Sequence, residues 1–235
     1  MSKPKATQPP VDGSFTYFND GREVELLRYV YALGSQVENN PQAILDAIDK
    51  FGNEEKYLMN VGQWKGVTVE EQIKENKPKV MVELGCYVGY SAISFARHLK
   101  NIPGSRYYSI EMDPLFSAIA TKLIELAGLQ DIVKVITASA DKGLLKLQKQ
   151  YKVDKVDFFF IDHTKDRYLP DLQTIESLQL LQKGSVIVAD NVIQPGNPPY
   201  LNYIRNHKHF SSRMVESYEP YTAVKDAIEI SVYTD

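Results

Sequence analysis

The segment KVMVELGCYVGYS (79–91) begins with a short apolar run, residues 79–85, that ends in glycine and leads into a helical pattern from Ser91 to Leu99. The strand pattern recurs four more times, at RYYSIEM (106–112), IVKVITA (132–138), VDFFFID (156–162) and SVIVADN (185–191). Helical patterns separate these runs, from Asp113-Pro114 to before Gly128, from Asp141 to Tyr151 and from Tyr168 to Leu181. Alternating strands and helices, with strands apolar on both faces, predict an open and mostly parallel sheet covered by helices on both sides.

Both ends of the chain depart from this alternation. Residues 210–217 and 227–234 predict two strands joined by a charged loop, which would form an antiparallel edge. Helices are predicted from about Arg22, at Asn40-Pro41, where a cap residue precedes proline, and from about Val67 to Asn76 after the loop KYLMNVGQWKG (56–66). The expected fold is therefore α/β, a Rossmann-like doubly wound sheet with an antiparallel C-terminal edge hairpin and extra N-terminal helices.

Length and composition narrow the class of protein. The 235 residues suit one domain, expected over residues 21–235, behind a proline-punctuated and disordered tail at 1–20. A single cysteine and four histidines exclude a disulfide framework and a Cys/His zinc cluster. The net charge of −3 does not favour nucleic acid or an anionic membrane as a partner. Because no apolar run approaches ~20 residues and no secretory signal is evident, we expect a cytoplasmic monomer.

In a doubly wound sheet, ligands bind outside the carboxyl ends of the strands. The first such turn has glycines at 85 and 89, a G-x-x-x-G spacing that differs from the G-x-G-x-x-G of pyrophosphate sites. Glu83 stands just before the turn, where a carboxylate would repel a pyrophosphate but accept from an ammonium group. The loop alone is equally compatible with a tight turn that carries a solvated acid.

Glu111 ends the second strand, at the place where an acid usually accepts from ribose hydroxyls. Met112 follows, and its polarizable thioether can lie flat on a purine. Taken alone, Glu111 could be an ordinary solvated strand end. Together with the glycine turn, it indicates a nucleoside ligand without phosphates, and S-adenosylmethionine fits that description.

Asp162 and the pair Asp190-Asn191 end two strands that we expect to be neighbours. Three oxygen ligands without sulfur or imidazole predict a Mg²⁺ site, which we favour over a carboxylate cluster held by lysines. Lys165 could then act as a general base, because the metal disfavours a second positive charge beside it. Spacing alone favours the simpler interpretation, an ion pair of Lys165 with Asp162 or Asp166.

Aromatic and apolar residues could wall a flat pocket, although isolated residues of this kind more often pack in the core or on the surface. The candidates are Tyr57, Met59, Trp64 and Pro195. The histidines of RNHKHF (205–210) resemble a solvated loop and are assigned no role.

Five segments closely resemble the catechol O-methyltransferase family: MNVGQWKG (59–66), VELGCYVGYSAISFAR (82–97), AGLQD (127–131), DFFFIDHTKDRYLPD (157–171) and KGSVIVADNVIQPG (183–196). The resemblance extends over about residues 22–235. It implies binding of S-adenosylmethionine and Mg²⁺ and methyl transfer to one hydroxyl of a small-molecule catechol.

The resemblance also implies residue roles. Cofactor contacts fall on Val61, Glu83, Gly85, Tyr87, Ser91, Glu111, Met112, Ser139, Asp162 and His163. The metal ligands would be Asp162, Asp190 and Asn191, and the catalytic residue would be Lys165. The substrate would contact Tyr57, Met59, Lys165, Asn191, Pro195 and Glu219.

The sequence departs from the family pattern at four places. An indole of the family's catechol pocket is Tyr57 here, a second tryptophan is Thr164, and an adenine-contacting glutamine is Ala140. A substrate-binding glutamate aligns with Pro220, and Glu219, one place away, is expected to substitute for it. These changes predict a more open and more polar substrate pocket.

Three other functions are considered. A Mg²⁺-dependent O-methyltransferase for a caffeoyl-type ester would need basic residues for a long acyl carrier, and none cluster near Tyr57 or Glu219. A nucleotide-binding oxidoreductase would need the phosphate-binding glycine pattern. An inactive binding protein would have lost the Asp/Asp/Asn/Lys set, which is present.

Overall fold

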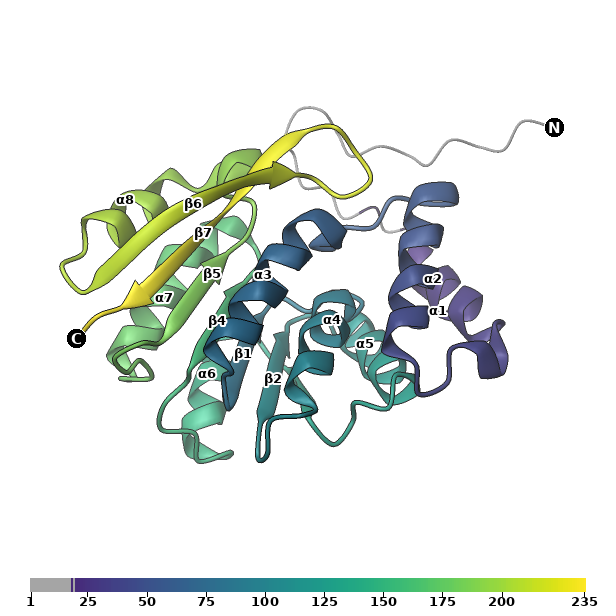
Figure 1. Ribbon diagram of the computed structural model, residues 1–235, viewed down its shortest axis with the longest axis horizontal. Helices are drawn as coiled ribbons and strands as arrows, with labels where there is room; N and C mark the ends of the chain where they lie inside the picture. The colour runs from purple at the N-terminus through teal and green to yellow at the C-terminus, as the bar shows by residue number, and fades with distance from the viewer. Residues whose placement is uncertain (1–17, 19) are drawn as a thin grey trace.

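A computed structural model describes residue 18 and residues 20–235. It contains a seven-stranded sheet in the order β3-β2-β1-β4-β5-β7-β6 (Figure 1). The strands are β1 (Val80–Leu84), β2 (Arg106–Glu111), β3 (Val133–Thr137), β4 (Phe158–Ile161), β5 (Val186–Ala189), β6 (Phe210–Tyr218) and β7 (Lys225–Tyr233). The strands β1 to β5 are parallel, whereas β7 runs antiparallel to β5 and to β6. The predicted doubly wound sheet and its antiparallel edge hairpin are confirmed.

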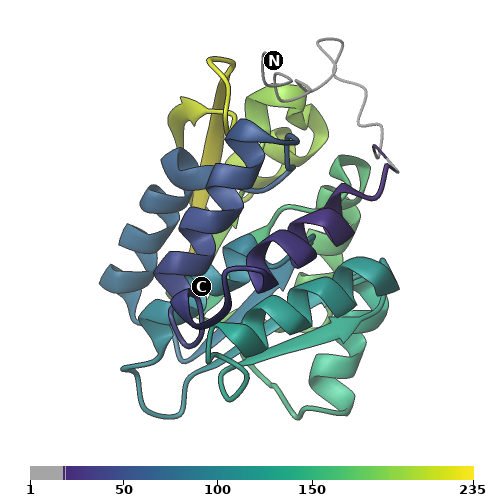
Figure 2. The same ribbon diagram turned by 90° about the vertical axis from the view of Figure 1, so that its right-hand side faces the viewer.

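Helices cover both faces of the sheet (Figures 1 and 2). The first face carries α1 (Arg22–Tyr31), α2 (Pro41–Glu54), α3 (Gly62–Asn76), α4 (Tyr90–Leu99) and α5 (Pro114–Leu126). The second carries α6 (Ala140–Lys149), α7 (Tyr168–Ser177) and α8 (Pro198–Asn206). Short turns η1 (Gly34–Gln36), η2 (Lys165–Arg167) and η3 (Val192–Gly196) join them. Two hydrophobic cores result, one on each side of the sheet.

The strand β4 shows why its apolar run is continuous. Phe158 and Phe160 point into the first core, while Phe159 and Ile161 point into the second. Because successive side chains of a strand face opposite ways, both faces must be apolar when both are covered. All four side chains are fully buried.

Helix starts follow a recurrent cap. The side chains of Asn40, Asp113 and Asn197 accept hydrogen bonds from backbone N–H groups of the first turns of α2, α5 and α8, and proline follows each cap. The first two starts were predicted. Helix α8 was not, although Asn197-Pro198 carries the same signal, because the neighbouring prolines and glycine of 195–199 indicate a loop.

Helix α3 is longer than the prediction, which placed its start at about Val67. It begins at Gly62, so part of the expected loop is helical. Lys65 explains the difference, because its side chain is fully buried against the sheet and fixes the first turn of the helix there.

The strand order changes direction at β1, which lies between β2 and β4. The turn after β1 passes so close to the end of β4 that a Cβ on Gly85 would come within 2.5 Å of the Asp162 carbonyl oxygen. Gly85 also has a φ of +93°, a conformation that glycine adopts without strain. The turn therefore lies at the switch point where such sheets bind ligands.

Two further expectations concern the chain as a whole. The predicted tail lies outside the described residues except for Phe18 and Asp20, which contact Arg22 at the start of α1. Within residue 18 and residues 20–235, no helix combines the length and the apolar character needed to cross a membrane.

Candidate active site

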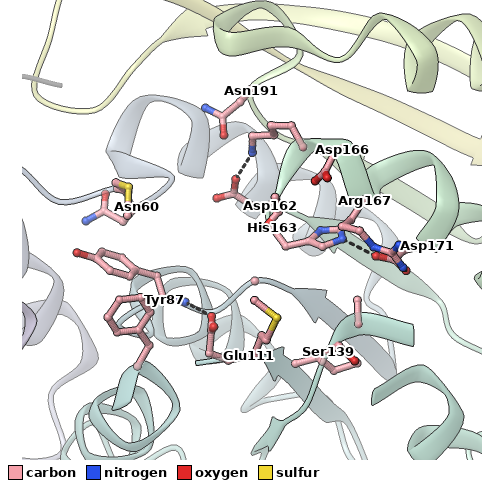
Figure 3. A pocket seen from close by; sticks show the side chains of 18 of the residues that line it. Asn60, Tyr87, Glu111, Ser139, Asp162, His163, Asp166, Arg167, Asp171 and Asn191 are labelled. Atoms are coloured by element: carbon pink, nitrogen blue, oxygen red, sulfur yellow. Dashed lines mark hydrogen bonds and ion pairs between the residues drawn. The ribbon is translucent and has the colours of Figure 1, made fainter. Parts of the chain in front are cut away.

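A cavity of about 710 Å³ opens at the carboxyl edge of the parallel strands. The structure brings thirteen of the predicted site residues together around it: Tyr57, Met59, Gly85, Tyr87, Glu111, Met112, Ser139, Asp162, His163, Lys165, Asn191, Pro195 and Glu219. In Figure 3, Asp162 and Asn191 lie on one side of the cavity, and Glu111 and Ser139 lie on the other. The cavity thus has an acidic, oxygen-rich end at Asp162 and Asn191 and a second end at Glu111 and Ser139.

Four predicted residues lie behind the wall of the cavity. Val61, Glu83, Ser91 and Asp190 are buried and do not line the open space. Glu83 is not the solvated acid that the turn alone would allow, because it accepts a hydrogen bond from the Ser109 hydroxyl inside the core. Burial raises the pKa of the Glu83 carboxyl to about 7.

Glu111 is fixed by the backbone around it. One carboxylate oxygen accepts from the N–H groups of Cys86 and Tyr87, at 3.0 and 2.9 Å, and the other accepts from the N–H of Asp113 at 2.9 Å. The residue is only 8% exposed, so it is not an ordinary solvated strand end. Its carboxylate is held at the cavity with lone pairs left to accept from a ligand hydroxyl.

Aromatic groups flank this end of the cavity. The Tyr87 ring packs edge-on against Phe116 at 5.0 Å, and its hydroxyl donates to Glu23 at 2.7 Å. Across from it, His163 stacks on Tyr168 and its Nε2 lies 2.8 Å from Asp171. Flat apolar surfaces on two sides, with Ser139 and Glu111 between them, can bind a purine nucleoside.

Lys165 stands at the acidic end. Its Nζ lies 2.9 Å from Asp162 Oδ1 and donates to the Tyr168 hydroxyl at 2.5 Å. That hydroxyl donates to the backbone oxygen of Asp190 at 3.2 Å. The ion pair favoured by spacing is therefore present, and it places the lysine nitrogen beside both strand ends.

A fully buried lysine, which sequence reasoning missed, lies beneath the acidic end. Lys65 Nζ is 2.8 Å from Asp190, 2.7 Å from Asp226 and 3.5 Å from Glu219. Burial opposes its charge, but the three carboxylates outweigh burial and raise the Lys65 pKa. A signal was available, since Lys65 is in helical register with the core residues Val69 and Ile73.

The donor types at this end, carboxylate and amide oxygens, are those that a hard divalent cation prefers. Four carboxylates, Asp162, Asp190, Glu219 and Asp226, gather around two lysines, and burial raises the pKa of Asp190 to about 7 and that of Glu219 to about 8. The Asn191 nitrogen donates to Glu219 and Asp226, which leaves its amide oxygen to act as a ligand. Across the described residues, no group of three or more His, Cys, Asp or Glu is arranged for a metal, so the predicted set depends on this amide.

The residues predicted to contact the substrate lie near the acidic end of the cavity, which is called the substrate end below. Tyr57, Met59 and Pro195 line the cavity together with Glu219. The Arg22 guanidinium holds the backbone oxygen of Tyr57 at 2.5 Å. Trp64, the fourth candidate for the pocket wall, does not line the cavity, and its 57% exposure agrees with the alternative of a surface residue.

Comparison with known proteins agrees with this geometry. A sequence profile described as O-methyltransferase matches residues 39–232. The chain belongs to the O-methyltransferase family. Family membership, first indicated by the sequence motifs, is thereby confirmed.

Individual relatives support the same family. The chain is 42% identical to a catechol O-methyltransferase of Bos taurus over 212 residues, 90% of this chain and 76% of that protein. It is 41% identical to the Mus musculus enzyme of the same name, again over 90% of this chain and 78% of that protein. Among solved structures, an O-methyltransferase of Streptomyces achromogenes shares the fold with a TM-score of 0.71 at 20% identity, covering 88% of this chain and 96% of that one.

Proposed function

We propose that this protein is a catechol O-methyltransferase that uses S-adenosylmethionine and Mg²⁺. The observation that carries the proposal is the two-ended cavity, in which Glu111 and His163 flank one end while Asp162, Asn191 and Lys165 form the other. The identity of 42% to the bovine enzyme supports the same assignment.

S-adenosylmethionine would supply a sulfonium methyl group. Asp162, Asp190 and Asn191 would hold Mg²⁺, which would supply a Lewis acid that favours ionisation of a catechol hydroxyl. The residues of the chain position the reactants. Glu111 accepts from the ribose hydroxyls, while Tyr87 and His163 enclose the nucleoside. Holding two reactants in line can lower the activation barrier by roughly 7–11 kcal/mol.

Lys165 performs the proton transfer in this proposal. A divalent cation on Asp162 would disfavour a second positive charge beside it, and Lys165 would then be neutral and able to accept the proton of the hydroxyl that becomes methylated. Asp162 and Tyr168 hold its Nζ in place. Glu219 accepts a hydrogen bond from the other hydroxyl. Tyr57 and Pro195 exclude water from the ring of the substrate.

A methylation assay over a panel of catechols, with Mg²⁺ or with excess chelator, tests the proposal. We expect product only from vicinal diols and only with the divalent cation. Asp162→Ala should abolish turnover and retain most of the S-adenosylmethionine affinity, since Glu111 is unchanged, whereas replacement of the exposed Asp154 by alanine should change neither. Full activity in chelator would contradict the metal assignment.

The panel also separates the alternative. Methylation of a caffeoyl-type ester without methylation of simple catechols would favour the related esterified substrate. Monomeric state and cytoplasmic location remain predictions of the sequence.

A further inference from the structure

The loop between β6 and β7 carries Glu219 to the substrate end of the cavity. It is closed by a backbone hydrogen bond from the Glu219 N–H to the Val224 oxygen at 2.9 Å. The next residue, Pro220, lies against the start of α3 so closely that a Cβ on Gly62 would come within 2.6 Å of the proline Cβ. The loop is therefore packed against helices from the opposite end of the chain.

Tyr221 makes the most specific of these contacts. Its hydroxyl donates to Asp49 Oδ1 of α2 at 2.9 Å and accepts from Asn60 Nδ2 at 2.8 Å. Its ring occupies the space above Gly52, where a Cβ would come within 2.4 Å of the ring carbon Cζ. The same ring meets Tyr57, a wall of the cavity, edge-on at 6.0 Å.

The backbone indicates that these contacts are needed to hold the loop. Tyr221 has a φ of +60°, which is uncommon for a bulky side chain and costs free energy. Such a conformation persists only where surrounding contacts determine it. The hydrogen bonds to Asp49 and Asn60 and the packing on Gly52 are contacts of that kind.

Asp49 itself is anchored independently of the loop. Its other oxygen, Oδ2, accepts from the Tyr90 hydroxyl of α4 at 2.9 Å. Burial raises the pKa of the Asp49 carboxyl, and the two phenols partly offset this effect. Two tyrosines thus bond one carboxylate from different elements, and only one of them belongs to the loop.

We propose that Tyr221 is a positioning residue whose contacts with Asp49, Asn60 and Gly52 form a latch that holds Glu219 and Tyr57 in place and so determines how the substrate sits. This inference rests on the proposed methyltransferase function. Tyr221 does not itself line the cavity and acts through Glu219 and Tyr57. The latch joins α2 and the segment before α3 to the C-terminal hairpin across the substrate end.

The test compares Tyr221→Phe with Tyr90→Phe, since both variants keep the ring and remove a phenol hydrogen bond to Asp49, and only Tyr221→Phe also removes the bond from Asn60. Four quantities are measured: KM and product ratio for 3,4-dihydroxybenzoate, S-adenosylmethionine affinity by calorimetry, and hydrogen exchange of residues 219–224. For Tyr221→Phe we expect KM to rise at least about tenfold, because both hydrogen bonds of the phenol are lost. The meta-to-para ratio should shift, loop amides should exchange faster, and cofactor affinity should be unchanged.

Tyr90→Phe should leave KM, product ratio and loop exchange at the parent values. A second variant, Gly52→Ala, displaces the ring and keeps the hydroxyl, and it should act like Tyr221→Phe. Its matched control is Gly66→Ala, where the new Cβ meets only an ordinary contact at 3.9 Å with Val61. In a Glu219→Gln background, Tyr221→Phe should change the product ratio less than it does in the parent, because the part of its effect that passes through Glu219 is already lost.

Equal behaviour of Tyr221→Phe and Tyr90→Phe in an active enzyme would overturn the latch and leave the proposed function standing. A full additional shift of the product ratio in the Glu219→Gln background would also overturn it. A parent protein that methylates no catechol would instead overturn the proposed function. The hydrogen exchange of residues 219–224 in the two tyrosine variants would then test the latch separately.

Discussion

The Glu111 side chain has two roles, since it connects the ends of two neighbouring strands and offers an acceptor to the cavity. Its carboxylate accepts from N–H groups that follow β1 and from one that follows β2, so it ties the ends of two neighbouring strands together. Removing the carboxylate would leave these N–H groups without their acceptor and would also remove an acceptor from the cavity.

We therefore predict that Glu111→Ala weakens S-adenosylmethionine binding. Loss of hydrogen bonds to a charged acceptor costs about 1.5–3 kcal/mol each, so the affinity should fall at least about tenfold. Titration calorimetry measures the change, and replacement of the exposed Glu125 of α5 by alanine is the control. An unchanged affinity would show that this carboxylate does not contact the cofactor.

Glu219 determines regiochemistry in the proposed reaction. We predict that Glu219→Ala and Glu219→Gln move the meta-to-para ratio of methylated 3,4-dihydroxybenzoate toward unity. Turnover should slow less, because Asp162, Asp190 and Asn191 would still hold the Mg²⁺ that binds the catechol. Chromatography of the products gives the ratio. Glu216→Ala, on the exposed side of β6, is the control, and parent ratios in both Glu219 variants would contradict the role.

At the residue scale, the topology of the sheet predicts which side chains at the strand ends lie together. The proximity of Asp162 and Asn191 could be predicted because the ends of parallel strands meet at one edge of the sheet. Lys65, Asp49 and Tyr221 come from separate parts of the chain, and their contacts depend on how helices pack on the sheet. No local pattern encodes such packing, although the register of Lys65 with core residues was a signal.

Among the elements, α3 connects the sheet to α4. Lys65 extends from the buried face of α3 toward the sheet, and Glu70, five residues later, faces α4. The Glu70 carboxylate accepts from Ser94, lies 2.6 Å from Arg97 and lies 3.1 Å from His98 Nε2. These contacts attach α3 to α4.

This attachment should depend on pH. Burial alone would raise the Glu70 pKa, but the close approach of His98, the hydrogen bond from Ser94 and the charge of Arg97 outweigh it and lower the pKa from 4.5 to about 2. A lowered folded-state pKa stabilises the protein above the unfolded value, and the stabilisation is lost as pH falls from about 4.5 toward 2.

We predict that Glu70→Gln reduces the free energy of unfolding at pH 7 by about 2 kcal/mol, less than the full shift implies because the partners are partly exposed. The deficit should disappear near pH 2. Denaturant unfolding at several pH values measures it, with the exposed neighbour Glu71→Gln as control. A deficit that is independent of pH would contradict the linkage.

Elements themselves were predicted well where periodicity and caps agreed. The five parallel strands and the edge hairpin followed from apolar runs between turn residues. Helix α8 was missed because prolines at 195, 198 and 199 suggest a loop, whereas Pro198 and Pro199 occupy the first turn, where the absent N–H groups are not needed. The early start of α3 was missed because burial of Lys65 overrides the weak helix propensity of its glycines.

At the scale of the whole molecule, the cavity is enclosed by segments from both ends of the chain. The region before α3 and the loop after β6 meet at the substrate end, while the turns after β1 and β2 form the cofactor end. A ligand that fills the cavity would therefore contact most of the fold at once and should stabilise it cooperatively.

We predict that S-adenosylmethionine at one hundred times its Kd raises the free energy of unfolding by about 2.7 kcal/mol. For a domain of this size, the Tm should rise by roughly 5–10 °C. Thermal unfolding with and without the cofactor measures the shift, and Glu111→Ala should diminish it at the same cofactor concentration. A larger shift with NAD would favour a nucleotide-binding oxidoreductase instead.

Trp64 is the only tryptophan of the chain, and it projects from the outer face of α3 between the glycine that packs on Pro220 and the lysine that enters the sheet. Its indole is therefore a built-in optical reporter at a single site. Fluorescence excited selectively in tryptophan should be emitted at long wavelength from a largely hydrated ring. Because the first turn of α3 carries both the contact with Pro220 and Lys65, a change in this emission when a ligand is added would report, without any label, a rearrangement of that turn.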